Sequence, residues 1–313
     1  MKRISMLLFS SLIFTTFHVA SPSSLAASTI NVNTNQQSSY GANIGWMNWR
    51  GDTTNGVVAS EFWLSGHIWG ANVGWIKVGA TSVPPNNIAW QNTVATNFGV
   101  NIVGGGELRG FAYGANIGWL VFTNRHAGGL LLESEIPRLN YKTGNFTGFA
   151  YGANVGWISL SNAFARVKTD IIQNAPDTDS DTIADAWELQ FSGSLATLGT
   201  ATTSDFDGDG KSDRDEYVAD TSPILQSDYL RIIALSANSA GSTSVVTWTS
   251  ELSRCYGLDT RTNLLSGTWT NTLLDAGTGV ISPDPSNSTT RTAGHVATSN
   301  RFFQVRAFKP LTP

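Results

Sequence analysis

A single heptamer occurs four times in the first half of the chain and constrains its fold more than any other feature. The copies span residues 40–46, 69–75, 113–119 and 151–157, and each reads aromatic-Gly-Ala-Asn-Ile/Val-Gly-Trp. Their starts are 29, 44 and 38 residues apart, so each copy belongs to a unit of about 40 residues. Units of this length bury a core only by packing against their neighbours.

The residues around the heptamer predict short antiparallel strands. The last two copies also match upstream, where Leu-Arg-Gly-Phe-Ala precedes Tyr113 and Phe-Thr-Gly-Phe-Ala precedes Tyr151. Aromatic and β-branched residues flank a Gly-Ala-Asn turn, and Gly and Asn tolerate positive φ angles. We therefore expect residues 28–168 (the repeat part) to form an antiparallel β-repeat domain, arranged as a prism, a roll or a propeller. In one arrangement the first copy, which lacks upstream strands, completes the last unit and closes the array.

The tryptophan that ends each heptamer allows two interpretations. The four are Trp46, Trp75, Trp119 and Trp157. We expect them to form the core, because a packing position recurs in every unit, while the heptamer asparagines hold the turns through bonds to the backbone. These asparagines are Asn43, Asn72, Asn116 and Asn154. In the alternative the aromatic rings are exposed and stack on sugars, as in many all-β lectins. The heptamer resembles Gly-x-Asn-Ile-Gly-Trp repeats of exported bacterial proteins.

The N-terminus predicts export. Lys2 and Arg3 precede an apolar run from Met6 to about residue 20, followed by small residues up to Ala27. This order is typical of a secretory signal peptide, here residues 1–27. The run contains polar residues and falls short of the ~20 residues of a membrane span. We therefore expect cleavage, a mature chain without a membrane span, and a secreted location, extracellular or periplasmic.

Acidic residues are concentrated in the middle of the chain. Between Asp170 and Asp220 there are 13 acidic and two basic residues, a local net charge of −11, whereas the rest of the mature chain carries +5. Such a concentration repels itself unless the carboxylates bind something. The whole chain has 19 Lys+Arg against 23 Asp+Glu, so no basic excess favours nucleic acid as a partner. One cysteine, Cys255, provides neither an intramolecular disulfide nor a Cys-based zinc site.

Two twelve-residue loops in this acidic segment (residues 170–223) have the ligand spacing of a calcium loop. Carboxylates occupy positions 1, 3, 5, 9 and 12, and position 7 supplies its backbone carbonyl. The predicted ligands of the second loop are Asp205, Asp207, Asp209, Lys211, Asp213 and Glu216. Those of the first loop are Asp177, Asp179, Asp181, Ile183, Asp185 and Glu188. The sequence therefore predicts calcium as a cofactor, the alternative being a solvated acidic linker.

The two loops differ at position 6, where the chain turns sharply. The second loop has Gly210 there and the first has Thr182, so we expect the first loop to be strained and to bind more weakly. Pro176 directly precedes the first loop, which leaves no room for the entering helix of an EF-hand. The segment resembles thrombospondin type 3-like calcium repeats, a resemblance that implies a calcium-stiffened spacer. A dockerin-like pair with a cohesin partner is the runner-up, which the 28-residue offset and the position-12 glutamates fit less well.

Short alternating segments predict a β-sandwich at residues 228–309 (the C-terminal part). Examples are 230–235, 244–249 and 301–306, separated by Gly, Asn, Asp and Ser turns. The order of Tyr256, a tryptophan and a closing Phe-Phe-x-Val-Arg resembles immunoglobulin- or fibronectin-like modules of secreted bacterial proteins. In this setting we expect Cys255 to be a buried small hydrophobe.

The sequence contains no catalytic motif that we can assign. The mature chain has only His67, His126 and His295, with neither a His-Glu-x-x-His nor a Gly-x-Ser-x-Gly pattern. Glu133 and Glu135 are the only pair considered for a glycosidase, on weak grounds. We expect a mainly β, secreted, non-enzymatic, calcium-binding modular protein with a structural, adhesive or surface-recognition role. Its candidate partner is a glycan or a cell-surface polymer. The alternatives are a carbohydrate-binding module and an unrecognised glycan-active hydrolase.

Overall fold

The computed structural model describes residues 27–51, 54–126, 128–164, 166–199, 203–237, 242–271, 280–294 and 301–312. The described structure is mainly antiparallel β with two short helices, which confirms the predicted class. The predicted signal peptide lies outside it, apart from Ala27. In the part of the chain that is described, neither helix approaches the length and apolarity that crossing a bilayer requires.

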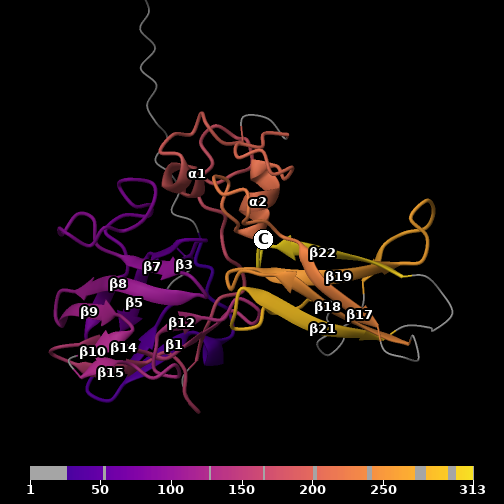
Figure 1. Ribbon diagram of the computed structural model, residues 1–313. Helices are drawn as coiled ribbons and strands as arrows, with labels where there is room; N and C mark the ends of the chain where they lie inside the picture. Colours follow the sequence, from indigo (N-terminus) through magenta and orange to yellow (C-terminus); the bar gives the residue numbers. More distant parts are fainter. Residues whose placement is uncertain are drawn as a thin grey trace, which may run out of the picture.

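Each heptamer forms the turn of a β-hairpin, and the four hairpins close into a barrel (Figure 1). The hairpins are β1 (Ser38–Gly41) with β2 (Gly45–Asn48), β5 (His67–Gly70) with β6 (Gly74–Lys77), β8 (Glu107–Gly114) with β9 (Gly118–Phe122), and β14 (Phe149–Gly152) with β15 (Gly156–Ser159). β2 pairs with β5, β6 with β8, β9 with β14, and β15 pairs back with β1. The first copy therefore does close the array, but as one eight-stranded barrel and not as a prism, roll or propeller.

The same register repeats around the whole barrel. Within each hairpin the first aromatic of the heptamer lies opposite its tryptophan, as Tyr40 lies opposite Trp46. Between hairpins, the residue two positions beyond the tryptophan lies opposite the next aromatic, as Asn48 lies opposite Trp69. This regular step of two residues supplies the stagger that a closed barrel requires.

Shorter strands extend the sheet at the strand ends away from the heptamer turns. One group is β3 (Val58–Ala59), β4 (Trp63–Ser65) and β7 (Val100–Val103), and the other is β12 (Arg138–Leu139), β13 (Asn145–Thr147) and β16 (Val167–Lys168). Both groups join the barrel through β8. The 3-10 turn η1 (Thr34–Gln36) precedes β1, and a separate ribbon pairs β10 (Arg125–His126) with β11 (Gly129–Leu130). The predicted order of strand, turn, strand, heptamer turn, strand is thus present in the third unit.

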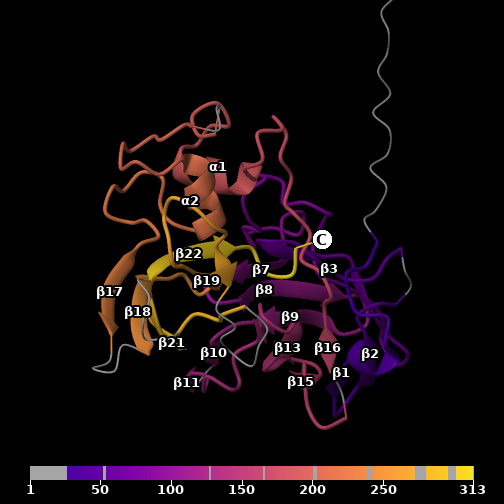
Figure 2. The same ribbon diagram turned by 90° about the vertical axis from the view of Figure 1, so that its right-hand side faces the viewer.

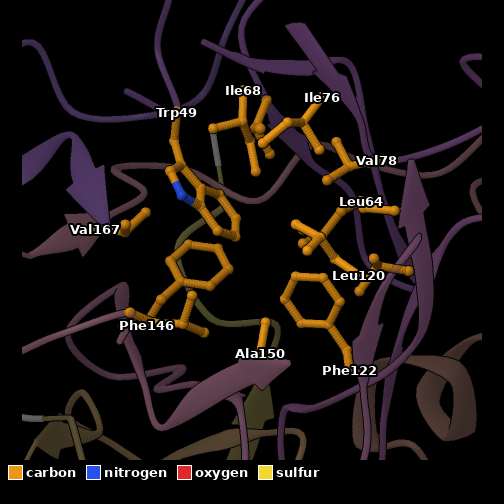
Figure 3. Packing of buried hydrophobic residues seen from close by; sticks show 14 of the residues in the cluster. Trp49, Leu64, Ile68, Ile76, Val78, Leu120, Phe122, Phe146, Ala150 and Val167 are labelled. Atoms are coloured by element: carbon orange, nitrogen blue, oxygen red, sulfur yellow. The ribbon is translucent and has the colours of Figure 1, made fainter. Parts of the chain in front are cut away.

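The barrel interior is filled by residues next to the tryptophans, as Figure 3 shows for Ile76 and Leu120. The buried positions are the fifth residue of each heptamer (Ile44, Val73, Ile117, Val155) and the residue after each tryptophan (Met47, Ile76, Leu120, Ile158). Side chains alternate across a strand, so the tryptophans point outward and are 40–50% exposed. The expectation that the repeated tryptophans form the core is therefore wrong.

The second residue of the heptamer is glycine because the fifth residue occupies the space inside the turn. A Cβ at Gly41, Gly70, Gly114 or Gly152 would lie 2.6–2.9 Å from the side chain of the fifth residue of the same heptamer. Real Cβ atoms essentially never approach so closely. The heptamer thus closes its end of the barrel with a branched aliphatic side chain folded over a glycine.

The heptamer asparagines bond to the backbone as expected, but each reaches the neighbouring turn. Asn72 Nδ2 donates to the carbonyl oxygen of Ile44 at 3.0 Å, and Asn116 Nδ2 donates to that of Val73 at 3.1 Å. Equivalent bonds run from Asn154 to Ile117 at 3.0 Å and from Asn43 to Val155 at 3.1 Å. The last bond spans 112 residues and closes a ring of four hydrogen bonds around the end of the barrel.

Two three-stranded sheets form the C-terminal part. They are β17 (Ile232–Ala237), β18 (Thr243–Thr249) and β21 (Ser288–Gly294), and β20 (Thr270–Asn271), β19 (Cys255–Arg261) and β22 (Phe302–Phe308). Buried residues of both sheets, including Trp248 and Tyr256, share one hydrophobic cluster. Cys255 is buried, and burial raises the pKa of its thiol to about 11, in keeping with a packing role.

The helices α1 (Asp185–Phe191) and α2 (Asp213–Ala219) lie at one end of the molecule, beside both β parts (Figure 1, Figure 2). Residues of the acidic segment, among them Trp187 and Tyr217, join Trp63, Trp90 and Phe98 of the repeat part in one buried cluster. The acidic segment is therefore packed against the repeat part.

The asparagine ring predicts the effect of Asn116→Asp. The substitution removes the amide donor and places a carboxylate against the carbonyl oxygen of Val73, so we expect the free energy of unfolding to fall by about 1–3 kcal/mol. Asn35→Asp, on the exposed turn η1, is the matched control. Urea denaturation measures both variants, and equal midpoints would show that the ring contributes no stability.

Candidate functional site

The predicted ligands at positions 1, 3 and 5 come together in both acidic loops. One carboxylate oxygen from each of Asp177, Asp179 and Asp181 lies within 4.8 Å of the other two, and the same holds for Asp205, Asp207 and Asp209. Three carboxylates at this range repel one another in the absence of a positive charge. The geometry of the two loops thus concentrates oxygen atoms at two points.

The position-12 glutamates are buried beside these aspartates. Glu188 in α1 is 0% exposed and Glu216 in α2 is 1% exposed. Among the described residues, none of their four carboxylate oxygens has a hydrogen-bond partner. One oxygen of Asp181, Asp207 and Asp209 is likewise buried and unpartnered. Buried polar groups in proteins are nearly always paired, so these unpartnered oxygens are available to a ligand.

Burial and the neighbouring aspartates also raise the pKa values of the two glutamates. Burial, reinforced by the neighbouring Asp181, Asp179, Asp185 and Asp177, raises the pKa of Glu188 to about 8. Burial and the aspartates of the second loop raise the pKa of Glu216 to about 8. A charged carboxylate in such a place is stabilised by a cation that replaces its lost hydration.

Hydrogen bonds inside the loops hold aspartate oxygens at positions 1 and 5. Asp177 accepts from the backbone N–H of Thr182 at 3.0 Å, and Asp205 accepts from that of Gly210 at 2.9 Å. Asp181 and Asp209 each accept from the backbone N–H of position 7, Ile183 at 2.8 Å and Lys211 at 2.6 Å. Both loops therefore have the same local fold. In the first loop the side chain of Ile183 also enters the buried cluster.

The position-9 aspartates, predicted as ligands, hold the start of each loop. Asp185 accepts from the backbone N–H of Thr178 at 2.7 Å and from its hydroxyl at 2.5 Å. Asp213 accepts from the backbone N–H of Phe206 at 2.9 Å and from that of Gly199 at 3.3 Å. These carboxylates are buried and engaged by the backbone, and neither belongs to the aspartate triplets.

The first loop holds two residues in a backbone conformation that favours glycine. Thr182 at position 6 has φ 81° and Ser180 at position 4 has φ 66°, where the second loop has Gly210 and Gly208. A β-branched residue in the left-handed region is strained. The expected strain at position 6 is thus present, and sequence analysis missed its counterpart at position 4, although aligning the two loops would have revealed it.

Helix α2 contacts the repeat part and the C-terminal part at once. The hydroxyl of Tyr217 donates to Glu61 at 2.7 Å, and Lys309 Nζ donates to the other Glu61 oxygen at 2.7 Å. Arg254 donates to the carbonyl oxygens of Val218 and Tyr217 at 2.8 Å each. Sequence reasoning missed this junction because its residues are far apart in the chain and belong to no motif.

A second candidate site is the row of aromatic pairs on the outer wall of the barrel. The first aromatic and the tryptophan of each heptamer are cross-strand neighbours, with ring centroids 4.9–5.2 Å apart. His67 lies beside Trp75, and His126 lies beside Trp157. Exposed aromatic pairs of this kind offer stacking surfaces to a ligand.

The residues considered for catalysis have other roles where they are described. Glu133 is 82% exposed and accepts from Arg138 at 2.7 Å, while Glu135 accepts from the backbone N–H of Leu132 at 2.9 Å. His295 lies outside the described residues. The geometry thus supplies no argument for a glycosidase at Glu133 and Glu135.

No protein-family model matches the chain, and comparisons with curated proteins and with solved structures find no match. Functional conclusions therefore rest on the geometry of the acidic loops and of the aromatic pairs.

The junction at α2 predicts a large effect for Lys309→Met. The substitution leaves Glu61, whose side chain is 9% exposed, without its ammonium partner, so we expect a loss of about 1–3 kcal/mol of stability. Lys168→Met, which breaks a pair at 3.8 Å with the more exposed Asp170, is the control and should cost about 0–1 kcal/mol. Adding Glu61→Gln to Lys309→Met should restore part of the loss in thermal unfolding. Equal costs for the two lysines would contradict a stabilising junction.

Proposed function

We propose that the protein is an exported, non-enzymatic, calcium-binding modular protein with a structural or surface-recognition role. The observation that carries the proposal is the pair of buried glutamates, Glu188 and Glu216, with unpartnered oxygens beside two aspartate triplets. The donors are oxygen atoms alone, which favours a hard cation over zinc or copper. A site of this size and flexibility suits calcium, which takes six to eight oxygens at 2.3–2.6 Å.

The proposed ligands are those predicted at positions 1, 3, 5, 7 and 12. They are Asp177, Asp179, Asp181, Glu188 and the carbonyl of Ile183 in the first loop, and Asp205, Asp207, Asp209, Glu216 and the carbonyl of Lys211 in the second. Asp185 and Asp213 act as positioning residues, because their carboxylates hold the loop backbone. A bound ion supplies the positive charge that lets the glutamates stay ionised.

Calcium in these loops would stiffen the connection between the two β parts. The loops lead directly into α1 and α2, whose Trp187 and Tyr217 pack against the repeat part. Arg254 of the C-terminal part binds the last turn of α2. These contacts support the resemblance to thrombospondin type 3-like spacers. The proposed division is residues 28–168, 170–223 and a β-sandwich at 228–309, and we propose on the sequence alone that a cleaved signal peptide precedes them.

Carbohydrate binding is the second candidate function. It is favoured by the exposure of the heptamer tryptophans. Tryptophans that formed the core would be buried. The repeat part would then be the recognition unit of the protein, with a glycan or a cell-surface polymer as its partner.

The calcium proposal predicts that substituting either glutamate lowers the stability of the protein when calcium is bound but not when calcium is absent. With millimolar calcium, Glu216→Gln and Glu188→Gln should lose about 1–2 kcal/mol of stability, the larger loss at Glu216. With a chelator both variants should be as stable as the parent or more stable, because a buried carboxylate has been removed. Glu133→Gln, on an exposed glutamate, is the control. Calorimetry and proteolysis between residues 170 and 220 measure the effects. Identical behaviour with and without calcium would refute the proposal.

The strain in the first loop predicts that Thr182→Gly improves it. Glycine adopts φ 81° without a steric cost, so we expect about 1–2 kcal/mol of relief and about tenfold tighter calcium binding by that loop. Gly210→Thr makes the reciprocal change in the second loop and should weaken binding there. Isothermal titration calorimetry of the full chain measures the calcium affinities of both variants. A Thr182→Gly protein with unchanged affinity would show that position 6 does not set the ranking of the two sites.

A further inference from the structure

The heptamer pair of Tyr113 and Trp119 lies beside a hollow in the part of the chain that the structure describes. The hollow has a volume of about 390 Å³, within the range of about 300–1,000 Å³ for small-ligand pockets. Its walls are the loop 92–95 and the rings of Phe98, Phe111 and Trp119. It is found at the copy preceded by the longest spacing in the repeat, 44 residues, which contains the loop.

Three aromatic rings meet around one indole in this hollow. Phe98 lies 5.0 Å from Trp119, with the ring planes at 85°, and Phe111 lies 6.0 Å away at 74°. On the side of the heptamer pair, Tyr113 lies 4.9 Å from the same indole. Trp119 nevertheless remains 46% exposed. The indole is thus held in place by its neighbours while part of its surface faces the hollow.

The loop that forms the polar wall is fixed by its own asparagines. Asn97 Oδ1 accepts from the backbone N–H groups of Thr93 and Val94 at 2.9 Å each, and its Nδ2 donates to the Thr93 hydroxyl at 2.9 Å. Asn92 Oδ1 accepts from the backbone N–H of Gly99 at 3.0 Å. Because the Thr93 hydroxyl accepts from Asn97, its own proton remains available for donation to a ligand. The wall is therefore preorganised, which lowers the entropic cost of binding.

Among the described residues, the other three pairs have different aromatic neighbours. Trp46 contacts only the ring of Tyr40. Trp75 contacts Trp69 and His67, and Trp157 contacts Tyr151, Phe149 and His126. The third copy combines an aromatic corner with a wall of amide and hydroxyl groups that its own hydrogen bonds hold in place.

We propose that this hollow binds one ring of a neutral carbohydrate. Aromatic rings pack against the C–H faces of a sugar, and Thr93 would bond to its hydroxyl groups. The lining contains no ionisable side chain, so it offers nothing to an acidic sugar. Three rings around one indole suit a single compact unit, whereas a proline-rich peptide requires a row of aromatic ridges. This inference deepens the carbohydrate-binding candidate and does not depend on the calcium sites.

The test is binding of the full chain, with calcium present, to immobilised oligosaccharides. The neutral probes are cello-, chito-, malto- and manno-oligosaccharides, and the comparison probes are oligogalacturonate and decaproline. We expect binding to at least one neutral series. Trp119→Ala should weaken it about tenfold or more, Trp119→Phe should retain part of it, and Thr93→Val should weaken it. Trp46→Ala removes the indole of another pair of the row and tests whether binding belongs to the hollow or to the row as a whole. Phe164→Ala, on an 87% exposed ring outside both the row and the hollow, is the matched control and should bind like the parent.

The results distinguish sugar binding in the hollow from carbohydrate binding elsewhere on the repeat part. Equal losses for Trp46→Ala and Trp119→Ala would overturn the hollow as the site while leaving carbohydrate binding by the repeat in place. No binding to any neutral series, or binding to oligogalacturonate or decaproline alone, would overturn both. Thermal midpoints of Trp46→Ala and Trp119→Ala should agree within a few degrees, since both indoles are exposed. A much lower thermal midpoint for Trp119→Ala would identify a packing role for that indole. In that case Thr93→Val decides: loss of binding with an unchanged midpoint upholds the proposal, and unchanged binding overturns it.

Discussion

The pairing of β1 with β15 is the constraint on which the repeat part depends. It joins residues more than 100 positions apart and turns a row of four hairpins into a barrel without free edges in its wall. Once the ring is closed, the alternation of side chains decides what faces inward. Aliphatic residues, together with Trp49, Phe122 and Phe146, then fill the interior, and the heptamer aromatic pairs remain on the outside. The asparagine bonds follow the same closed path around the barrel end.

The acidic segment depends on a different force, the balance between charge and burial. Its carboxylates are brought together by loops that bond to themselves, and its helices are held by apolar contacts with the repeat part and by Arg254 of the C-terminal part. The packing that buries the glutamates is thus the same packing that joins the two β parts. An ion in either loop would act on the junction through the helix that follows the loop.

Local patterns in the sequence predicted the hairpins, the two loops and the strained Thr182, because each depends on neighbouring residues. They failed for the tryptophans, since regular recurrence marks an outward position in a symmetric ring as strongly as an inward one. The alternation of Gly45, Trp46 and Met47 contained the correct answer, as neighbouring residues on a strand cannot share a face. The closed barrel, the reach of Asn43 to Val155 and the contact of Glu61 with Lys309 depend on long-range pairing that no local pattern encodes.

The unequal spacing of the heptamers has a consequence for how such a protein diversifies. The intervals differ by as much as 15 residues, yet the register at every junction of the barrel is the same. Additional residues are accommodated in the connections between hairpins, where backbone changes leave the hydrogen-bonded ring unaltered. Each quarter of the wall can therefore acquire its own loop independently of the others. A single inherited framework could in this way display four surfaces that evolve separately, much as variable loops do on a constant immunoglobulin scaffold.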